Sequence, residues 1–69
     1  MIYKAQGDWS CYEKDNRGIG LEDGELFWCD GSLEDINGKQ RLVVLTANGI
    51  KHIMWVTDPS RIGVPVVNQ

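Results

Sequence analysis

The strongest structural signal in this chain lies in residues 39–57, which read KQRLVVLTANGIKHIMWVT. Two runs of β-branched and other apolar residues flank the Asn48-Gly49 pair. Because Asn and Gly both tolerate the positive φ angles of a type I′ turn, the pattern predicts a β-hairpin with these two residues as its loop. In the predicted register, Leu45 lies opposite His52 and Val44 lies opposite Ile53.

Both faces of this predicted hairpin are apolar, because side chains alternate between the two faces along each strand. One face carries Val43, Leu45, Ala47, Ile50, Met54 and Val56. The other carries a smaller set, Leu42, Val44, Ile53 and Trp55, ringed by polar residues. One apolar face is enough for a half-buried antiparallel sheet. We therefore expect the smaller patch to be an exposed interface, with coverage by the chain's own termini as the alternative.

The same turn signal occurs at Asn37-Gly38 and predicts a second hairpin, which pairs Ile36 with Lys39. The segment Ser32–Ile36 also fits the start of a capped helix, with Gly38 as its terminator. The strand is the favoured interpretation, because it continues directly into the first hairpin as a three-stranded meander.

Turn signals recur about every ten residues along the whole chain. Segments with strand composition lie between them, at residues 1–6, 9–12, 25–30, 39–47, 50–57 and 62–67. In the last segment, Pro65 cannot donate to a ladder and so predicts an edge strand. The sequence thus predicts a single all-β domain over residues 1–69, a small antiparallel barrel or curled sheet of five to six short strands, SH3-like or OB-like.

Composition limits what the chain does. It has 69 residues, of which 25% are charged and 42% hydrophobic. A domain of about 60 residues buries only roughly 60% of its unfolded surface, so we expect stability to need a partner or a second copy. The first eight residues lack the features of a secretory signal, and no apolar run approaches membrane-spanning length. We expect a cytoplasmic protein in which Cys11 and Cys29 stay reduced.

No motif for catalysis or cofactor binding is present in the sequence. The glycine-rich segment 18–24 has Asp23 where a dinucleotide-binding loop needs a third glycine, so we expect a flexible turn. Cys11, Cys29 and His52 lack the paired spacing of a zinc site. We expect His52, the single histidine, to be partly buried with a hydrogen-bond partner. The chain is therefore expected to be no enzyme, with no cofactor and no metal.

Charge is divided unevenly along the chain. Residues 1–38 carry nine acidic and three basic side chains, whereas residues 39–69 carry one acidic and four basic ones. Such asymmetry favours a binding protein whose acidic surface engages a basic partner. The expected contact residues are those of the exposed hairpin patch and its acidic surroundings: Leu42, Lys51, Ile53, Trp55, Glu22, Asp23, Glu34 and Asp35.

The favoured function is that of a small acidic inhibitor or accessory protein, similar in size and charge to those that phages use to block host factors. Two alternatives stay open. One is a self-associating barrel that binds a small ligand at its subunit boundaries. The other is a barrel that binds single-stranded nucleic acid by stacking bases on exposed aromatic rings beside Arg41, Lys51 and Arg61. The net charge of −3 counts against nucleic acid, because phosphate neutralisation supplies most of non-specific affinity.

Overall fold

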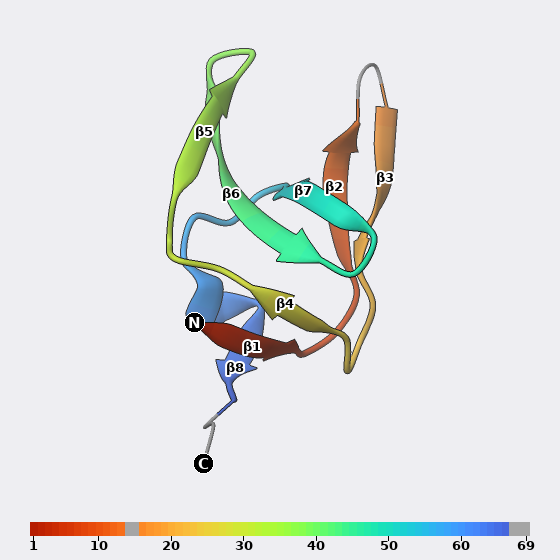
Figure 1. The fold of residues 1–69 in the computed structure, drawn as a ribbon. Coiled ribbons are helices and arrows are strands. Elements are labelled where there is room, and N and C mark those ends of the chain that lie inside the picture. Colours follow the sequence, from red (N-terminus) through yellow and green to blue (C-terminus); the bar gives the residue numbers. More distant parts are fainter. Residues whose placement is uncertain (14–15, 67–69) are drawn as a thin grey trace.

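The computed structural model describes residues 1–13 and 16–66, which form one antiparallel sheet of eight strands (Figure 1). The strands are β1 (Ile2–Ala5), β2 (Trp9–Glu13), β3 (Asn16–Leu21), β4 (Leu26–Trp28), β5 (Leu33–Ile36), β6 (Lys39–Thr46), β7 (Gly49–Ile53) and β8 (Gly63–Pro65). A single 3₁₀ turn, η1 (Pro59–Arg61), precedes β8 within this part of the chain. The all-β prediction is confirmed, with more strands than the five to six expected. In the described part, no helix has the length and apolar character needed to cross a membrane.

The strands are hydrogen-bonded in the order β3-β2-β7-β6-β4-β1-β8, and β5 pairs with β6 outside this path. Strand β6 is the centre of the sheet: β7 lies along one edge, while β5 and then β4 lie along the other. Because the path ends at β3 and β8, the sheet is open and strongly curled instead of closing into a barrel. The position of β8 at an end of the path confirms the edge strand predicted from Pro65.

The hairpin of β5 and β6 has the predicted register, with Ile36 opposite Lys39 and Leu33 opposite Leu42. Its loop is Asn37-Gly38, with φ angles of 55° and 78°. The strand interpretation of Ser32–Ile36 is therefore confirmed in residues 33–36, and the capped-helix alternative is wrong.

The hairpin of β6 and β7 forms, but its register differs from the prediction. Leu45 lies opposite Ile50 instead of His52. The reason is Thr46, whose Oγ1 accepts a hydrogen bond from the Asn48 N–H and donates one to the Gly49 carbonyl oxygen, each at 3.0 Å. The turn is thereby centred on Ala47 and Asn48, with the positive φ of 111° at Gly49. Each partner moves by two residues, so the side chains of the paired residues of β6 and β7 keep their predicted faces.

The face that was expected to be exposed is instead the core. Leu42, Val44 and Ile53 are at most 1% exposed. The buried side chains that cover them come from β1 to β4 and from the segments that follow β4 and η1: Ala5, Cys11, Leu21, Phe27, Cys29 and Ile62. The chain itself thus covers Leu42, Val44 and Ile53, with residues from its middle as well as its ends, whereas Trp55 stays exposed. The prediction that Leu42 and Ile53 belong to an exposed contact surface is wrong.

The expected flexible turn at residues 18–24 is also wrong over its first part, because residues 16–21 form β3 and pair with β2. Gly20 explains this strand. A Cβ atom at Gly20 would lie 2.9 Å from Cys11 Cβ and 2.9 Å from Ile53 Cδ1. The glycine therefore allows β3 to pack closely against the core, and Leu21 beside it is fully buried.

Candidate functional site

Four apolar side chains form a row across β1, β4, β6 and β7. Trp28 lies opposite both Ile2 and Leu45, and Leu45 lies opposite Ile50. Directly opposed residues of antiparallel strands point to the same face of the sheet. All four side chains are between 44% and 65% exposed. We call these four residues the apolar row.

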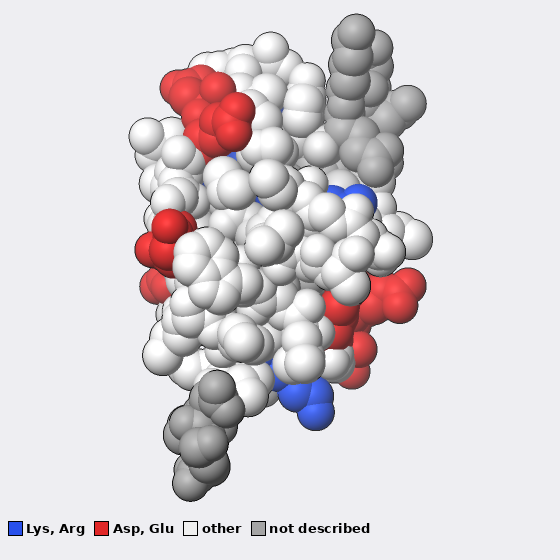
Figure 2. All heavy atoms as spheres, in the orientation of Figure 1, with Lys and Arg blue, Asp and Glu red and all other residues white. Residues whose placement is uncertain are grey.

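The surface around the apolar row is hollowed and largely uncharged. A hollow of about 210 Å³ is lined mainly by Trp28, Val43, Leu45 and Ile50, with Asp30 and Ser32 beside them. Figure 2 shows mostly uncharged atoms across the middle of the view, where β6, β4 and β1 lie in Figure 1, and places the charged side chains toward its margins. The row is thus an apolar strip with a polar rim.

Asp30 supplies a negative charge at the edge of this hollow. Hydrogen bonds from the side chain and the backbone of Ser32 lower the pKa of the Asp30 carboxyl, and the backbone N–H of Ser32 lies 2.9 Å from Oδ1. Asp30 is therefore ionised at neutral pH, directly beside apolar surface.

The acidic residues predicted to act together lie in two places. Glu22 and Asp23 are in the connection between β3 and β4, where Asp23 Oδ1 accepts a hydrogen bond from the Gly7 N–H at 2.8 Å. Glu34 and Asp35 are on β5, where Asp35 Oδ1 accepts a hydrogen bond from the Gly38 N–H at 3.0 Å. Figure 2 shows the acidic side chains as separate groups, so no single acidic face is visible in that view.

His52 is partly buried and paired, as predicted. Its Nε2 lies 2.8 Å from Glu34 Oε2, and its side chain is 24% exposed. The described residues contain no group of three side chains placed to hold a metal ion.

Cys11 and Cys29 are both buried free thiols. Burial raises the pKa of the Cys29 thiol, although a hydrogen bond from the Gly31 backbone opposes this effect. A thiol with a raised pKa holds little thiolate at neutral pH, so Cys29 is poorly suited to nucleophilic chemistry.

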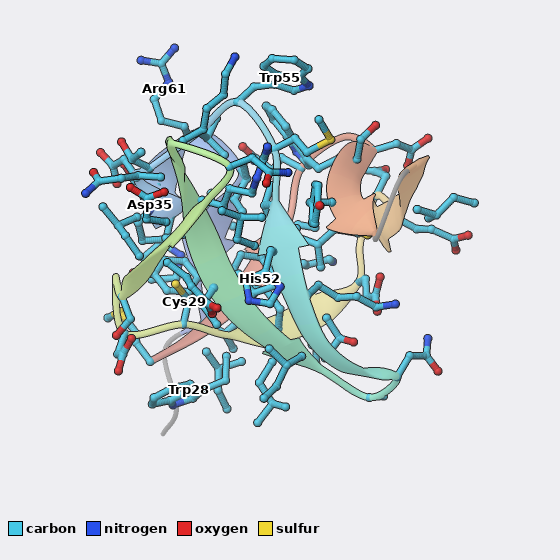
Figure 3. The ribbon with its side chains drawn as sticks, turned by 90° about the horizontal axis from the view of Figure 1, so that it is seen from above. Trp28, Cys29, Asp35, His52, Trp55 and Arg61 are labelled. Carbon is cyan, nitrogen blue, oxygen red and sulfur yellow. The ribbon has the colours of Figure 1, made fainter. Side chains whose placement is uncertain are left out.

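The two remaining predicted contact residues lie outside the apolar row. Lys51 lines a separate hollow of about 280 Å³ together with Glu22 and Glu25. Trp55 is 68% exposed, and Figure 3 shows Trp28 and Trp55 pointing away from the ribbon on opposite sides. Of these two exposed tryptophans, Trp55 was among the predicted contact residues and Trp28 was not. The available signal for the apolar row was the larger apolar face of the hairpin, which carries Leu45 and Ile50.

Comparisons with protein-family models, with curated proteins and with solved structures find no match for this chain.

Proposed function

We propose that this chain is a non-enzymatic binding protein that engages another protein through the apolar row. The observation that carries the proposal is the alignment of Ile2, Trp28, Leu45 and Ile50 across four strands, all substantially exposed. Contiguous apolar surface with a polar rim marks interaction sites in soluble proteins. A tryptophan at the centre of such a surface is the residue type that most often dominates binding energy.

The partner we propose has an apolar contact surface bordered by Lys or Arg. Asp30 lies in the same hollow as Trp28, and the whole chain carries a net charge of −3. A second copy would bring like charges together across the interface, whereas a basic margin would complement them. Charge thus favours a basic protein partner over self-association.

The biological role we propose is that of a cytoplasmic inhibitor or accessory protein of the phage type, which acts by covering its partner's surface. We include in this proposal the SH3-like or OB-like fold expected from the sequence, in which a small curled sheet binds its partner on one face. Function is not deducible from fold alone, so the proposal rests on the apolar row.

The test compares two exposed tryptophans. The wild-type protein, Trp28→Ala and Trp55→Ala are immobilised, and the protein that the wild type captures is identified. This partner is then purified and titrated against each variant to measure its affinity. We expect Trp28→Ala to weaken binding by about 30-fold, the effect of losing a dominant interface residue. Trp55→Ala, the matched control on the opposite side, should bind like the wild type. Asp30→Asn should lower the association rate and its dependence on salt.

Two results would contradict the proposal. One is equal loss of binding in both tryptophan variants. The other is a dimer in sedimentation experiments that Trp28→Ala dissociates, which would assign the apolar row to a second copy of this chain.

A further inference from the structure

A second surface, away from the apolar row, combines an aromatic ring with two cations. Trp55, Val56, Thr57, Asp58 and Arg61 line a hollow of about 230 Å³. The Lys39 Nζ lies 5.8 Å from the centre of the Trp55 ring. Figure 3 shows Trp55 and Arg61 on the same side of the molecule, opposite Trp28.

The backbone at Trp55 is strained. Its φ angle is 74°, in the left-handed region that bulky residues rarely occupy. The side chain is 68% exposed, so packing into the core does not account for a tryptophan at this position. Strained residues of this kind cluster at sites that bind ligands. The ring is held at the surface at a cost that a glycine or asparagine would avoid.

Two cations lie at this surface: Arg61 lines the hollow, and Lys39 lies over the Trp55 ring. Asp58 Oδ1 already accepts hydrogen bonds from the Ser60 N–H at 3.0 Å and from the Ser60 hydroxyl at 2.9 Å. Among the described residues, the ion pair within 4.0 Å is that of His52 and Glu34, and neither Lys39 nor Arg61 has a carboxylate at that distance. The site therefore offers a flat apolar face and two positive charges, of which Arg61 acts electrostatically on the Asp58 carboxylate in the same hollow.

We propose that this hollow binds a phosphorylated nucleoside, with the base stacked on Trp55 and the phosphate held by Arg61, while Lys39 turns from the ring toward the phosphate. Any base can stack on an indole ring, and the guanidinium fork matches phosphate oxygens. The hollow of about 230 Å³ is small for a ligand site, which fits one nucleotide unit. A net charge of −3 disfavours a long polyanion, so a free nucleotide fits better than a strand. This site is independent of the apolar row.

The experiment follows the three indole N–H resonances of ¹⁵N-labelled protein during titration with adenosine monophosphate to about 10 mM. We expect the Trp55 resonance to shift and those of Trp9 and Trp28 to stay in place. Adenosine alone and inorganic phosphate alone should each bind at least about tenfold more weakly, because each makes half of the contacts. A ten-residue oligodeoxyadenylate forms the second arm. Tighter binding of this strand than of the mononucleotide, with the same Trp55 shift, would assign the nucleotide unit to single-stranded nucleic acid.

Two variants separate loss of the site from loss of the fold. Trp55→Asn removes the ring but tolerates the positive φ angle, so we expect it to lose binding while its melting temperature stays equal or rises. Arg61→Met should weaken the mononucleotide about tenfold and leave adenosine unchanged. Trp28→Ala, which tests the apolar row, should bind the mononucleotide like the wild type.

The proposal is overturned if neither adenosine monophosphate nor the oligonucleotide moves the Trp55 resonance, or if Trp28 moves as far. It is also overturned if Trp55→Asn binds as well as the wild type. If phosphate or phosphotyrosine bound as tightly as the mononucleotide, with the same shift of the Trp55 resonance, the assignment to a nucleoside would be wrong.

Discussion

Gly20 of β3 approaches Cys11 of β2 so closely that a Cβ atom at Gly20 would lie 2.9 Å from Cys11 Cβ. Gly20→Ala must therefore displace buried side chains, and overpacking of this kind costs about 1–3 kcal/mol. We expect the free energy of unfolding in urea to fall by about that amount. Ile19→Ala, at the exposed neighbouring position, should change it by less than about 0.5 kcal/mol. An alanine variant as stable as the wild type would show that the core has room at this point.

Leu42 and Leu45 lie on the same strand but on opposite faces, one fully buried and the other about half exposed. Leu42→Ala should cost about 2–5 kcal/mol of stability, as expected for a leucine removed from a closed core. Leu45→Ala should cost less than about 1 kcal/mol. Equilibrium denaturation of both variants tests the assignment of the faces. A larger loss of stability in Leu45→Ala than in Leu42→Ala would mean that the face carrying Leu45 is the buried one.

The two Asn-Gly pairs differ in backbone conformation. Asn37 has a positive φ of 55°, whereas Asn48 is not among the described residues with positive φ. Asn37 also donates a hydrogen bond from Nδ2 to the Tyr12 hydroxyl at 3.1 Å. Asn37→Ala should destabilise the protein by about 1–2 kcal/mol, the cost of a left-handed backbone at an alanine. Asn48→Ala should change stability by less than about 0.5 kcal/mol. Equal losses in thermal or urea unfolding would mean that both pairs form left-handed turns.

Asp58 makes stability depend on pH in the acidic range. Hydrogen bonds from the backbone and the hydroxyl of Ser60 lower the pKa of its carboxyl. A folded-state pKa below the unfolded value means that the unfolded chain binds more protons, so this contribution is complete above about pH 4 and is lost as the pH falls through the lower folded value. We expect the temperature midpoint of unfolding to decrease as the pH is lowered through this range.

Asp58→Asn isolates that contribution, because an asparagine still caps η1 but does not titrate. The variant should unfold near the wild-type midpoint at neutral pH and show a shallower decline below about pH 4. An unchanged pH profile would assign the decline to other carboxyl groups. The fully exposed position of Asp58 makes the expected difference small.

The local features of the fold were predictable because they depend on neighbouring residues. Asn37-Gly38 sets the register of β5 on β6 through its own turn geometry. Pro65 marks an edge because it has no N–H to donate. The β6–β7 register was missed because the Thr46 side chain, which competes for the turn, carries a weaker signal than the Asn-Gly pair beside it.

The candidate site was predictable only in part. Leu45 and Ile50 were identified as one apolar face of the hairpin, but their neighbours in the row, Ile2 and Trp28, come from strands far away in the sequence. No local pattern joins β1, β4 and β6. The Trp55 site was equally hidden, because it depends on a left-handed backbone at a residue type that normally avoids it.

Within β6 and β7, the sequence by itself determined which side chains share a face, because the alternation of a strand has a period of two and survives a register shift of two residues. It did not determine which face turns inward, since both faces of the central hairpin are apolar. Tertiary structure decided that point when β1 to β4 folded over Leu42, Val44 and Ile53. Gly20 allowed β3 to approach closely enough to pack against this core. Leu45 and Ile50, on the opposite face, were thereby left at the surface, where they join Ile2 and Trp28 in the apolar row.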